Sequence, residues 1–147
     1  MMHGLGIDIG GSGIKGALVD LAKGCLVGDR HRIATPQPAT PAAVLETVRA
    51  IIDHFSWSGP VGIGLPSAVP GGVAMTAAHI DDGWVGLRVE DYFKQALGVP
   101  VTVLNDADAA GIAEIEYGLG REAQGTVMML TLGTGIGSAL FVNGTLV

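Results

Sequence analysis

The sequence has 147 residues, a length typical of one domain with its own hydrophobic core. Hydrophobic residues make up 48% of it and charged residues only 15%, and this balance excludes a largely disordered chain. Eight Lys and Arg residues against 14 Asp and Glu residues give a net charge of −6, which argues against a general nucleic-acid binder. Any phosphate that the protein handles must therefore be held locally, by backbone amides and a few cations.

Targeting and redox signals are lacking in these 147 residues. No apolar run approaches the roughly 18 residues that a membrane helix needs, and the N-terminus has no signal-peptide pattern. The single Cys25 cannot form an internal disulfide, and no cluster of Cys and His has zinc-binding spacing. We interpret Cys25 as a small strand residue rather than a reactive thiol. Together these features predict a soluble protein in the reducing cytoplasm, with neither a membrane nor a nucleic acid as partner.

The first half of the chain predicts an antiparallel meander followed by a helix. Three β-prone runs cover residues 4–9, 14–19 and 25–33, and the first turn between them is rich in glycine. Thr40 can cap a helix whose first residue is Pro41, and apolar residues then recur on one helical face as far as Phe55.

The second half predicts strands alternating with helices. The predicted strands cover residues 61–65, 101–104, 127–132 and 138–142, and the predicted helices cover 89–97 and 106–117. We expect a hairpin turn at Gly71–Gly72 that leads into residues 73–75, and a second one at Asn143–Gly144. The whole pattern indicates an α/β fold with a mixed sheet, an antiparallel first hairpin and flanking helices.

The first glycine-rich turn combines residue types that suit a metal-bound phosphate. They are Asp8, Gly10, Gly11, Ser12, Gly13 and Lys15. Glycines let the backbone approach a ligand closely and adopt conformations that other residues avoid, and successive amides can form a concavity for an anion. Asp8, at the strand end, can hold Mg²⁺ directly or through water. A tight hairpin without a ligand would use the same glycines, and the spacing matches neither the Walker loop nor G-x-G-x-x-G.

A second glycine-rich turn follows the same logic near the end of the chain. Gly133, Thr134 and Gly135 join two apolar runs, and their amides and hydroxyl are candidates for another part of a phosphate chain. One such turn is weak evidence for a ligand. Two of them in one chain predict a phosphate chain held between two hairpins.

Asn105 and Asp106 stand between a predicted strand and a predicted helix. An aspartate there commonly caps the helix, and Asp108 is equally able to do so. Ligands of α/β sheets also lie at the carboxyl ends of strands, so Asp106 is a candidate to accept the proton of an alcohol that attacks phosphorus. Asn105 would then hydrogen-bond neighbouring hydroxyls. His79 is a weaker candidate for substrate contact, because a histidine in a surface turn explains it equally.

Three segments resemble the motifs of one family in the expected order. Residues 6–16 (GIDIGGSGIKG) resemble the first phosphate loop of the ROK sugar kinases (repressor, open reading frame, kinase), residues 103–111 (VLNDADAAG) their catalytic segment, and residues 130–140 (LTLGTGIGSAL) their second phosphate loop. The resemblance implies the actin-like ATPase/hexokinase fold, which is ribonuclease H-like. Residues 35–41 and 105–114 are most similar to the polyphosphate glucokinases of this family.

This resemblance implies phosphoryl transfer to the 6-hydroxyl of glucose, with inorganic polyphosphate and often ATP as donor, and with Mg²⁺. It assigns the general base to Asp106, sugar contacts to Asn105 and Asp106, donor phosphates to both glycine turns and the metal to Asp8. It also implies a homodimer for the full-length protein.

Departures from the family pattern affect the expected sugar pocket and the length. The family's Pro-Gly pair reads Pro66-Ser67 here, and His79 precedes Trp84 where relatives often have Asn, so Ser67 is a candidate sugar-binding residue. The family's Glu-x-Gly-His segment and second lobe are not in the sequence. We therefore expect residues 1–147 to form an N-terminal lobe with little activity by itself.

Two other functions stay open at this point. The acidic balance favours an ATP-dependent ROK kinase for glucose or an N-acetylhexosamine, because a long polyanion would prefer a basic groove. A non-catalytic sugar-sensing ROK module is the second alternative. Such repressors usually carry an N-terminal helix-turn-helix domain, for which the sequence leaves no room, and Asp106 favours a kinase.

Overall fold

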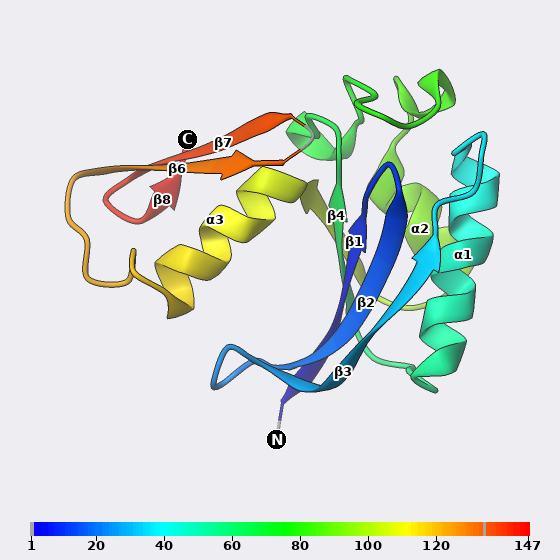
Figure 1. Ribbon diagram of the computed structural model, residues 1–147, viewed down its shortest axis with the longest axis horizontal. Helices are drawn as coiled ribbons and strands as arrows, with labels where there is room; N and C mark the ends of the chain where they lie inside the picture. The colour runs from blue at the N-terminus through cyan, green and yellow to red at the C-terminus, as the bar shows by residue number, and fades with distance from the viewer. Residues whose placement is uncertain (1, 134) are drawn as a thin grey trace. The chain divides into compact units, whose positions relative to one another are not determined.

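A computed structural model describes residues 2–133 and 135–147, and it has a mixed α/β architecture (Figure 1). The chain divides into two compact units, Met1–Asn105 and Asp106–Val147. Within the described residues, no helix is long and apolar enough to cross a membrane.

The first unit is built on a five-stranded mixed sheet. Its strands are β1 (His3–Ile9), β2 (Gly13–Asp20), β3 (Cys25–Ala34), β4 (Val61–Leu65) and β5 (Val101–Asn105). They lie in the order β3-β2-β1-β4-β5, with β1, β2 and β3 antiparallel and β4 and β5 parallel to β1. The predicted meander is therefore confirmed, and Cys25 lies in β3 with its side chain exposed.

Two helices cover one face of this sheet, α1 (Pro41–His54) over β2 and β3 and α2 (Val89–Leu97) against β5 (Figure 1). The caps are as predicted, since Thr40 Oγ1 accepts from Ala43 N and Gly98 ends α2 with a left-handed φ of 67°. The core lies between these helices and the sheet. Its buried members from β1, β2 and α1 are Leu5, Ile7, Ile9, Ile14, Val44, Leu45, Val48 and Ile51.

The predicted hairpin at Gly71–Gly72 is wrong. Pro70–Gly72 form a short 3₁₀ turn, η1, and Val73 pairs with Arg88 in a single antiparallel bridge. Arg88 is far from Val73 in the sequence because the loop between them contains a second 3₁₀ turn, η2 (Asp82–Trp84). This turn places Trp84 in the core. Trp84 is fully buried, and its indole N–H donates to the carbonyl of Ala39 at 2.8 Å.

The second unit consists of α3 (Asp106–Tyr117) and a three-stranded antiparallel sheet of β6 (Thr126–Leu132), β7 (Ile136–Val142) and β8 (Thr145–Leu146). The helix packs closely on β7, because a Cβ on Gly111 would lie 2.8 Å from the Cβ of Ala139. Asn143 and Gly144 have φ values of 49° and 78°, so the predicted hairpin turn is confirmed.

Candidate functional site

The first glycine loop, residues 10–13, closes the hairpin between β1 and β2. The Gly10 amide donates to the Gly13 carbonyl at 3.0 Å. None of its three glycines has a φ in the left-handed region, so the expectation that they adopt conformations barred to other residues is wrong. Crowding explains Gly10 and Gly11 instead, because a Cβ on Gly10 would lie 2.9 Å from the Gly13 carbonyl oxygen and one on Gly11 2.7 Å from the Cβ of His79. A Cβ on Gly13 would meet only the end of the flexible Arg32 side chain, which can move aside.

Three successive carbonyls of this loop are held by donors from β3 and from the segment that follows it. The pairs are Gly10 O with Thr35 Oγ1 at 2.5 Å, Gly11 O with Gln37 Nε2 at 3.3 Å, and Ser12 O with Arg32 Nη2 at 2.9 Å. The sequence motifs do not indicate these three donors, although Thr35 and Gln37 lie within the segment 35–41 that resembles the polyphosphate glucokinases. Which donor reaches which carbonyl depends on how β3 pairs with β2.

The backbone amides of the same loop differ from its carbonyls in their hydrogen bonding. In the described part of the chain, the amides of Gly11 and Ser12 have no hydrogen-bond partner. Successive amides in a turn can form a concavity for an anion. The amides of Gly11 and Ser12 are therefore candidate donors to a phosphate.

Asp8 and Lys15 lie beside this loop on the sheet face opposite the core. They are register partners on β1 and β2, and Lys15 Nζ lies 3.8 Å from Asp8 Oδ2. Both side chains are about half exposed, at 46% for Lys15 and 55% for Asp8, so their attraction contributes little to stability. Both charged groups therefore reach solvent beside the loop.

The second glycine loop closes the β6–β7 hairpin of the second unit. Its Gly133 amide donates to the Gly135 carbonyl at 3.0 Å. A Cβ on either glycine would meet nothing within 4 Å, so this loop is open where the first one is crowded. Thr134, the predicted hydroxyl of this turn, lies outside the described residues.

Ser67 and Asn105 connect the ends of two parallel strands, β4 and β5. The side-chain amide of Asn105 donates to the main-chain carbonyl of Ser67 at 3.0 Å. The Ser67 side chain is only 2% exposed, and its hydroxyl bonds the carbonyl of Ala68 and the amide of Thr76. Ser67 therefore orients Asn105 through its carbonyl, while its hydroxyl is bound within its own loop.

Asp106 is the first residue of α3 and is exposed. Its Oδ1 accepts from the amide of the next residue, Ala107, at 2.8 Å, whereas a capping side chain accepts from an amide two or three residues on. Burial, and to a lesser extent the charge of Asp106, raises the pKa of Asp108. The two acids thus occupy different environments, one exposed and one partly buried.

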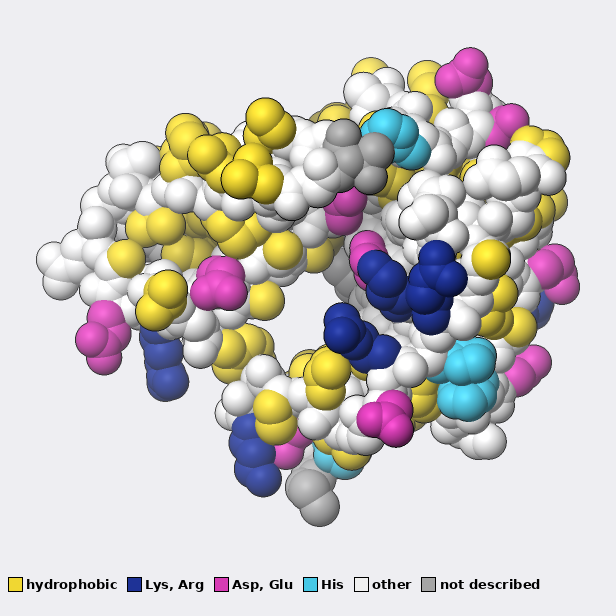
Figure 2. Space-filling model, in the orientation of Figure 1, with side chains coloured by type: hydrophobic (Ala, Val, Ile, Leu, Met, Phe, Trp, Pro, Cys, Tyr) yellow, Lys and Arg dark blue, Asp and Glu magenta, His cyan; other side chains and the backbone are white. Residues whose placement is uncertain are grey.

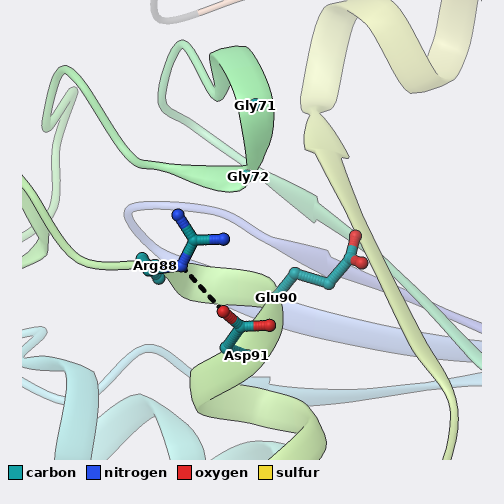
Figure 3. A pocket seen from close by; sticks show the side chains of 5 residues that line it. All are labelled: Gly71, Gly72, Arg88, Glu90 and Asp91. Carbon is teal, nitrogen blue, oxygen red and sulfur yellow. Dashed lines mark hydrogen bonds and ion pairs between the residues drawn. The ribbon is translucent and has the colours of Figure 1, made fainter.

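A shallow hollow beside η1 and α2 is lined by Gly71, Gly72, Arg88, Glu90 and Asp91 (Figure 3). Arg88 Nε donates to Asp91 Oδ2 at 2.8 Å, and the Glu90 carboxylate bonds Lys94 and the amide of Val103. Its charged side chains therefore already satisfy one another or the fold, and we assign no ligand to it.

The model of the family described as "ROK family" matches residues 4–147. The chain belongs to the ROK family. It is 53% identical over 146 residues to a polyphosphate glucokinase of Mycobacterium tuberculosis, covering 99% of this chain and 55% of that protein. It is 32% identical to a glucokinase of Halalkalibacterium halodurans, covering 97% of this chain and 44% of the relative. The chain thus spans about half the length of these relatives.

Solved ROK structures share its fold. An inorganic polyphosphate/ATP-glucomannokinase from Arthrobacter sp. strain KM superposes with a TM-score of 0.95 at 47% identity, over 100% of this chain and 61% of that one. A ROK glucokinase from Streptomyces griseus, solved with glucose and AMPPNP, gives 0.85 at 31% identity, over 99% and 46%. The predicted membership of the ROK family and the predicted actin-like ATPase fold are confirmed.

Proposed function

We propose that this ROK chain carries the donor loops and the catalytic acid of a sugar kinase that transfers phosphoryl groups from inorganic polyphosphate or ATP to the 6-hydroxyl of glucose. The observation that carries the proposal is the first glycine loop, whose carbonyls are occupied and whose amides at Gly11 and Ser12 have no partner within the described residues. The names of the M. tuberculosis and Arthrobacter relatives support the choice of sugar and donors.

Each candidate residue has one role in this reaction. Asp106 accepts the proton of the attacking hydroxyl, and Asn105, oriented by Ser67, hydrogen-bonds the sugar. The loop amides and Lys15 hold the donor phosphates, as do Gly133, Thr134 and Gly135 of the second loop. Positioning and electrostatic stabilisation supply most of the catalysis in phosphoryl transfer, which is the kind of help these groups offer.

Mg²⁺ fits the residues beside the first loop. Magnesium sites for phosphate substrates commonly use one or two carboxylates, with phosphate oxygens and water completing the octahedron. The half-exposed Asp8 supplies one carboxylate. In the described parts of the chain no group of three or more His, Cys, Asp and Glu residues could hold a metal by itself. When bound, the ion would neutralise charge on the donor phosphates.

The donor could instead be ATP alone. The net charge of −6 favours that alternative, because a long polyanion would be repelled by the chain as a whole. We further propose that residues 1–147 correspond to the N-terminal lobe of the kinase and that the full-length protein is a homodimer. The cytoplasmic location stays a prediction.

A chimera tests the proposal. This chain replaces the aligned 146 residues of the M. tuberculosis relative, and glucose 6-phosphate formation is measured with each donor. Asp106→Asn should lower kcat by about 100-fold or more, because a general base contributes about that much, and should leave glucose affinity within a few fold. The matched control, Asp108→Asn, should stay near the parent rate. Equal losses in both variants, or a kcat for Asp106→Asn within tenfold of the parent, would refute the role of Asp106.

The isolated 147-residue chain gives a second measurement. We expect it to form glucose 6-phosphate far more slowly than the chimera, because kinases of two lobes exclude water by closing around the substrate. Turnover equal to that of the chimera would show that the remaining part of the relative contributes nothing to catalysis.

A further inference from the structure

Lys and Arg side chains gather over β2 and β3 in Figure 2, next to the first glycine loop. Three of the eight Lys and Arg residues of the chain, Lys15, Arg30 and Arg32, belong to these two strands. The proposed reaction uses only Lys15. The two arginines therefore call for a separate explanation in a chain whose net charge is −6.

The pairing of β2 with β3 places Lys15 beside Arg32, and Arg30 continues this row along β3. Arg32 is the register partner of Lys15 across the two strands. Arg30 stands two residues earlier on β3 and is exposed, in the segment where a β-bulge shifts the register with β2 between Gly16 and Leu18. The intervening His31 faces the other side, where its ring stacks on that of His54 in α1 with 3.7 Å between centroids. Lys15 and Arg32 therefore lie on the sheet face that α1 does not cover.

One member of the row is bound to the loop itself. Arg32 Nη2 donates to the Ser12 carbonyl at 2.9 Å, and its guanidinium lies against Gly13. β3 is an edge strand, and exposed Lys and Arg residues also protect such edges from pairing with other chains. Edge protection does not explain why Arg32 is bonded to the loop. Ligand binding does, because a ligand that continues outward from the loop amides would meet Arg32 first and Arg30 next.

We propose that Lys15, Arg32 and Arg30 form a cationic track that binds the phosphates of a linear polyanion beyond those held by the first glycine loop. The track rests on the proposed function and names its donor class as inorganic polyphosphate. We expect a triphosphate to be held mainly at the loop and a longer chain to continue to Arg30. The track thus offsets, at one place, the repulsion that the acidic chain exerts on a polyanion. It favours long polyphosphate over ATP by electrostatics alone.

Binding to the 147-residue chain tests the track without any need for turnover. Titration calorimetry at low salt compares long-chain inorganic polyphosphate with tripolyphosphate. Arg30→Gln should weaken the long polymer about three- to fivefold, the effect of one exposed charge pair, and leave tripolyphosphate unchanged. Arg30→Gln with Arg32→Gln should weaken the polymer about tenfold or more and flatten the dependence of its affinity on salt. Thermal unfolding confirms that each variant is folded.

Lys23→Gln is the matched control. It removes one positive charge from the turn between the same two strands, at the end away from the glycine loop, where Lys23 lies 3.8 Å from Asp20. Polymer affinity should not change in this variant. If Arg30→Gln and Lys23→Gln have equal effects while the parent chain binds both ligands, the track is wrong and the proposed function stands. If the parent binds neither ligand, both the track and the donor role of the first loop are wrong.

Discussion

At the scale of single residues, the first glycine loop shows that glycine is required by its neighbours. His79 has a φ of 62°, an uncommon value for a side-chain-bearing residue, and its Cβ and carbonyl lie where a side chain on Gly11 would go. His79 is exposed in a turn, as a surface histidine would be, yet its backbone packs on the loop. The loop is thus held from two sides, by His79 and by the donors to its carbonyls.

Gly11→Ala should therefore be destabilising. A Cβ there would lie 2.7 Å from the Cβ and 3.1 Å from the carbonyl oxygen of His79, and overpacking of this kind costs about 1–3 kcal/mol. Gly133→Ala, in the open second loop, should change the free energy of unfolding by less than about 0.5 kcal/mol. Urea unfolding followed by circular dichroism measures both. Equal effects would mean that crowding does not explain the glycine at position 11.

At the scale of elements, Glu90 connects helix α2 to the edge strand β5. Its carboxylate bonds the Lys94 ammonium and, at 3.2 Å, the amide of Val103. The hydrogen bond to Lys94, and to a lesser extent the one to Val103, lowers the pKa of Glu90 from its ordinary value of 4.5. A carboxylate with a lowered pKa in the folded state stabilises the fold above its unfolded pKa, and this stability is lost as the pH falls through the lowered value.

Glu90→Gln should thus cost about 1 kcal/mol at pH 7, because it removes the ionic part of both bonds. The difference from the parent should shrink as the pH falls below 4.5 and through the lowered pKa. Asp91→Asn is the control, since its ion pair with Arg88 is exposed and should contribute little. Urea unfolding over a pH series measures the effect, and a pH-independent difference would contradict the ionic role of Glu90.

The antiparallel strands of the two units differ in whether their apolar faces are covered. In the first unit, the apolar residues of β1 and β2 belong to the buried core, and α1 packs on β2 and β3. The corresponding residues of β6 and β7 are exposed, at 63% for Met128, 57% for Leu130, 80% for Leu132 and 79% for Ile136. Figure 2 shows hydrophobic side chains gathered over β6 and β7. A continuous apolar face of this kind favours association.

Leu130→Lys should therefore reduce self-association of the 147-residue chain. Sedimentation velocity over a concentration series should show association for the parent and a shift toward monomer for the variant. Thr126→Lys adds the same charge to an exposed polar position of β6 and should leave association unchanged. A parent chain that stays monomeric at all concentrations would overturn the expectation.

At the scale of the whole molecule, the core is distributed unevenly between the two units. The main buried cluster runs from Leu5 to Val103 and lies within the first unit. In the described part of the second unit, the buried residues are Ala107, Gly111, Ala139 and Phe141. A unit of about 40 residues with so few buried side chains cannot offset its loss of conformational entropy without further contacts.

Residues 1–105 should consequently fold when expressed without the second unit, whereas residues 106–147 should not. Fluorescence of the buried Trp84 reports the first unit, and its unfolding transition should stay within a few degrees of that of the whole chain. Amide exchange of the isolated second unit should show little protection. An unfolded 1–105 fragment would show that the first unit depends on the second.

Much of the fold could be predicted because its signals are local. The bounds of α2 follow from residues within one or two turns of each other, including Gly98 at its end. The hairpin at Gly71–Gly72 could not be excluded in this way, since Val73 pairs with Arg88, 15 residues away. At the site, local motifs indicated the glycines, Asp8 and Lys15, whereas the donors to the loop carbonyls were missed.

The amino-acid sequence alone determined the order of strands and helices, the family and the residues proposed for chemistry, because alternation, capping and motif spacing act between near neighbours in the chain. Only the tertiary structure decided which carbonyls of the first loop are occupied, which amides have no partner in the described residues, and that Arg32 lies beside Lys15. The contacts among them join residues 17 or more positions apart, as Arg32 to Lys15 and Arg32 to Ser12 do. Their partners are set by strand register, which depends on how whole faces pack rather than on the residues next to each one.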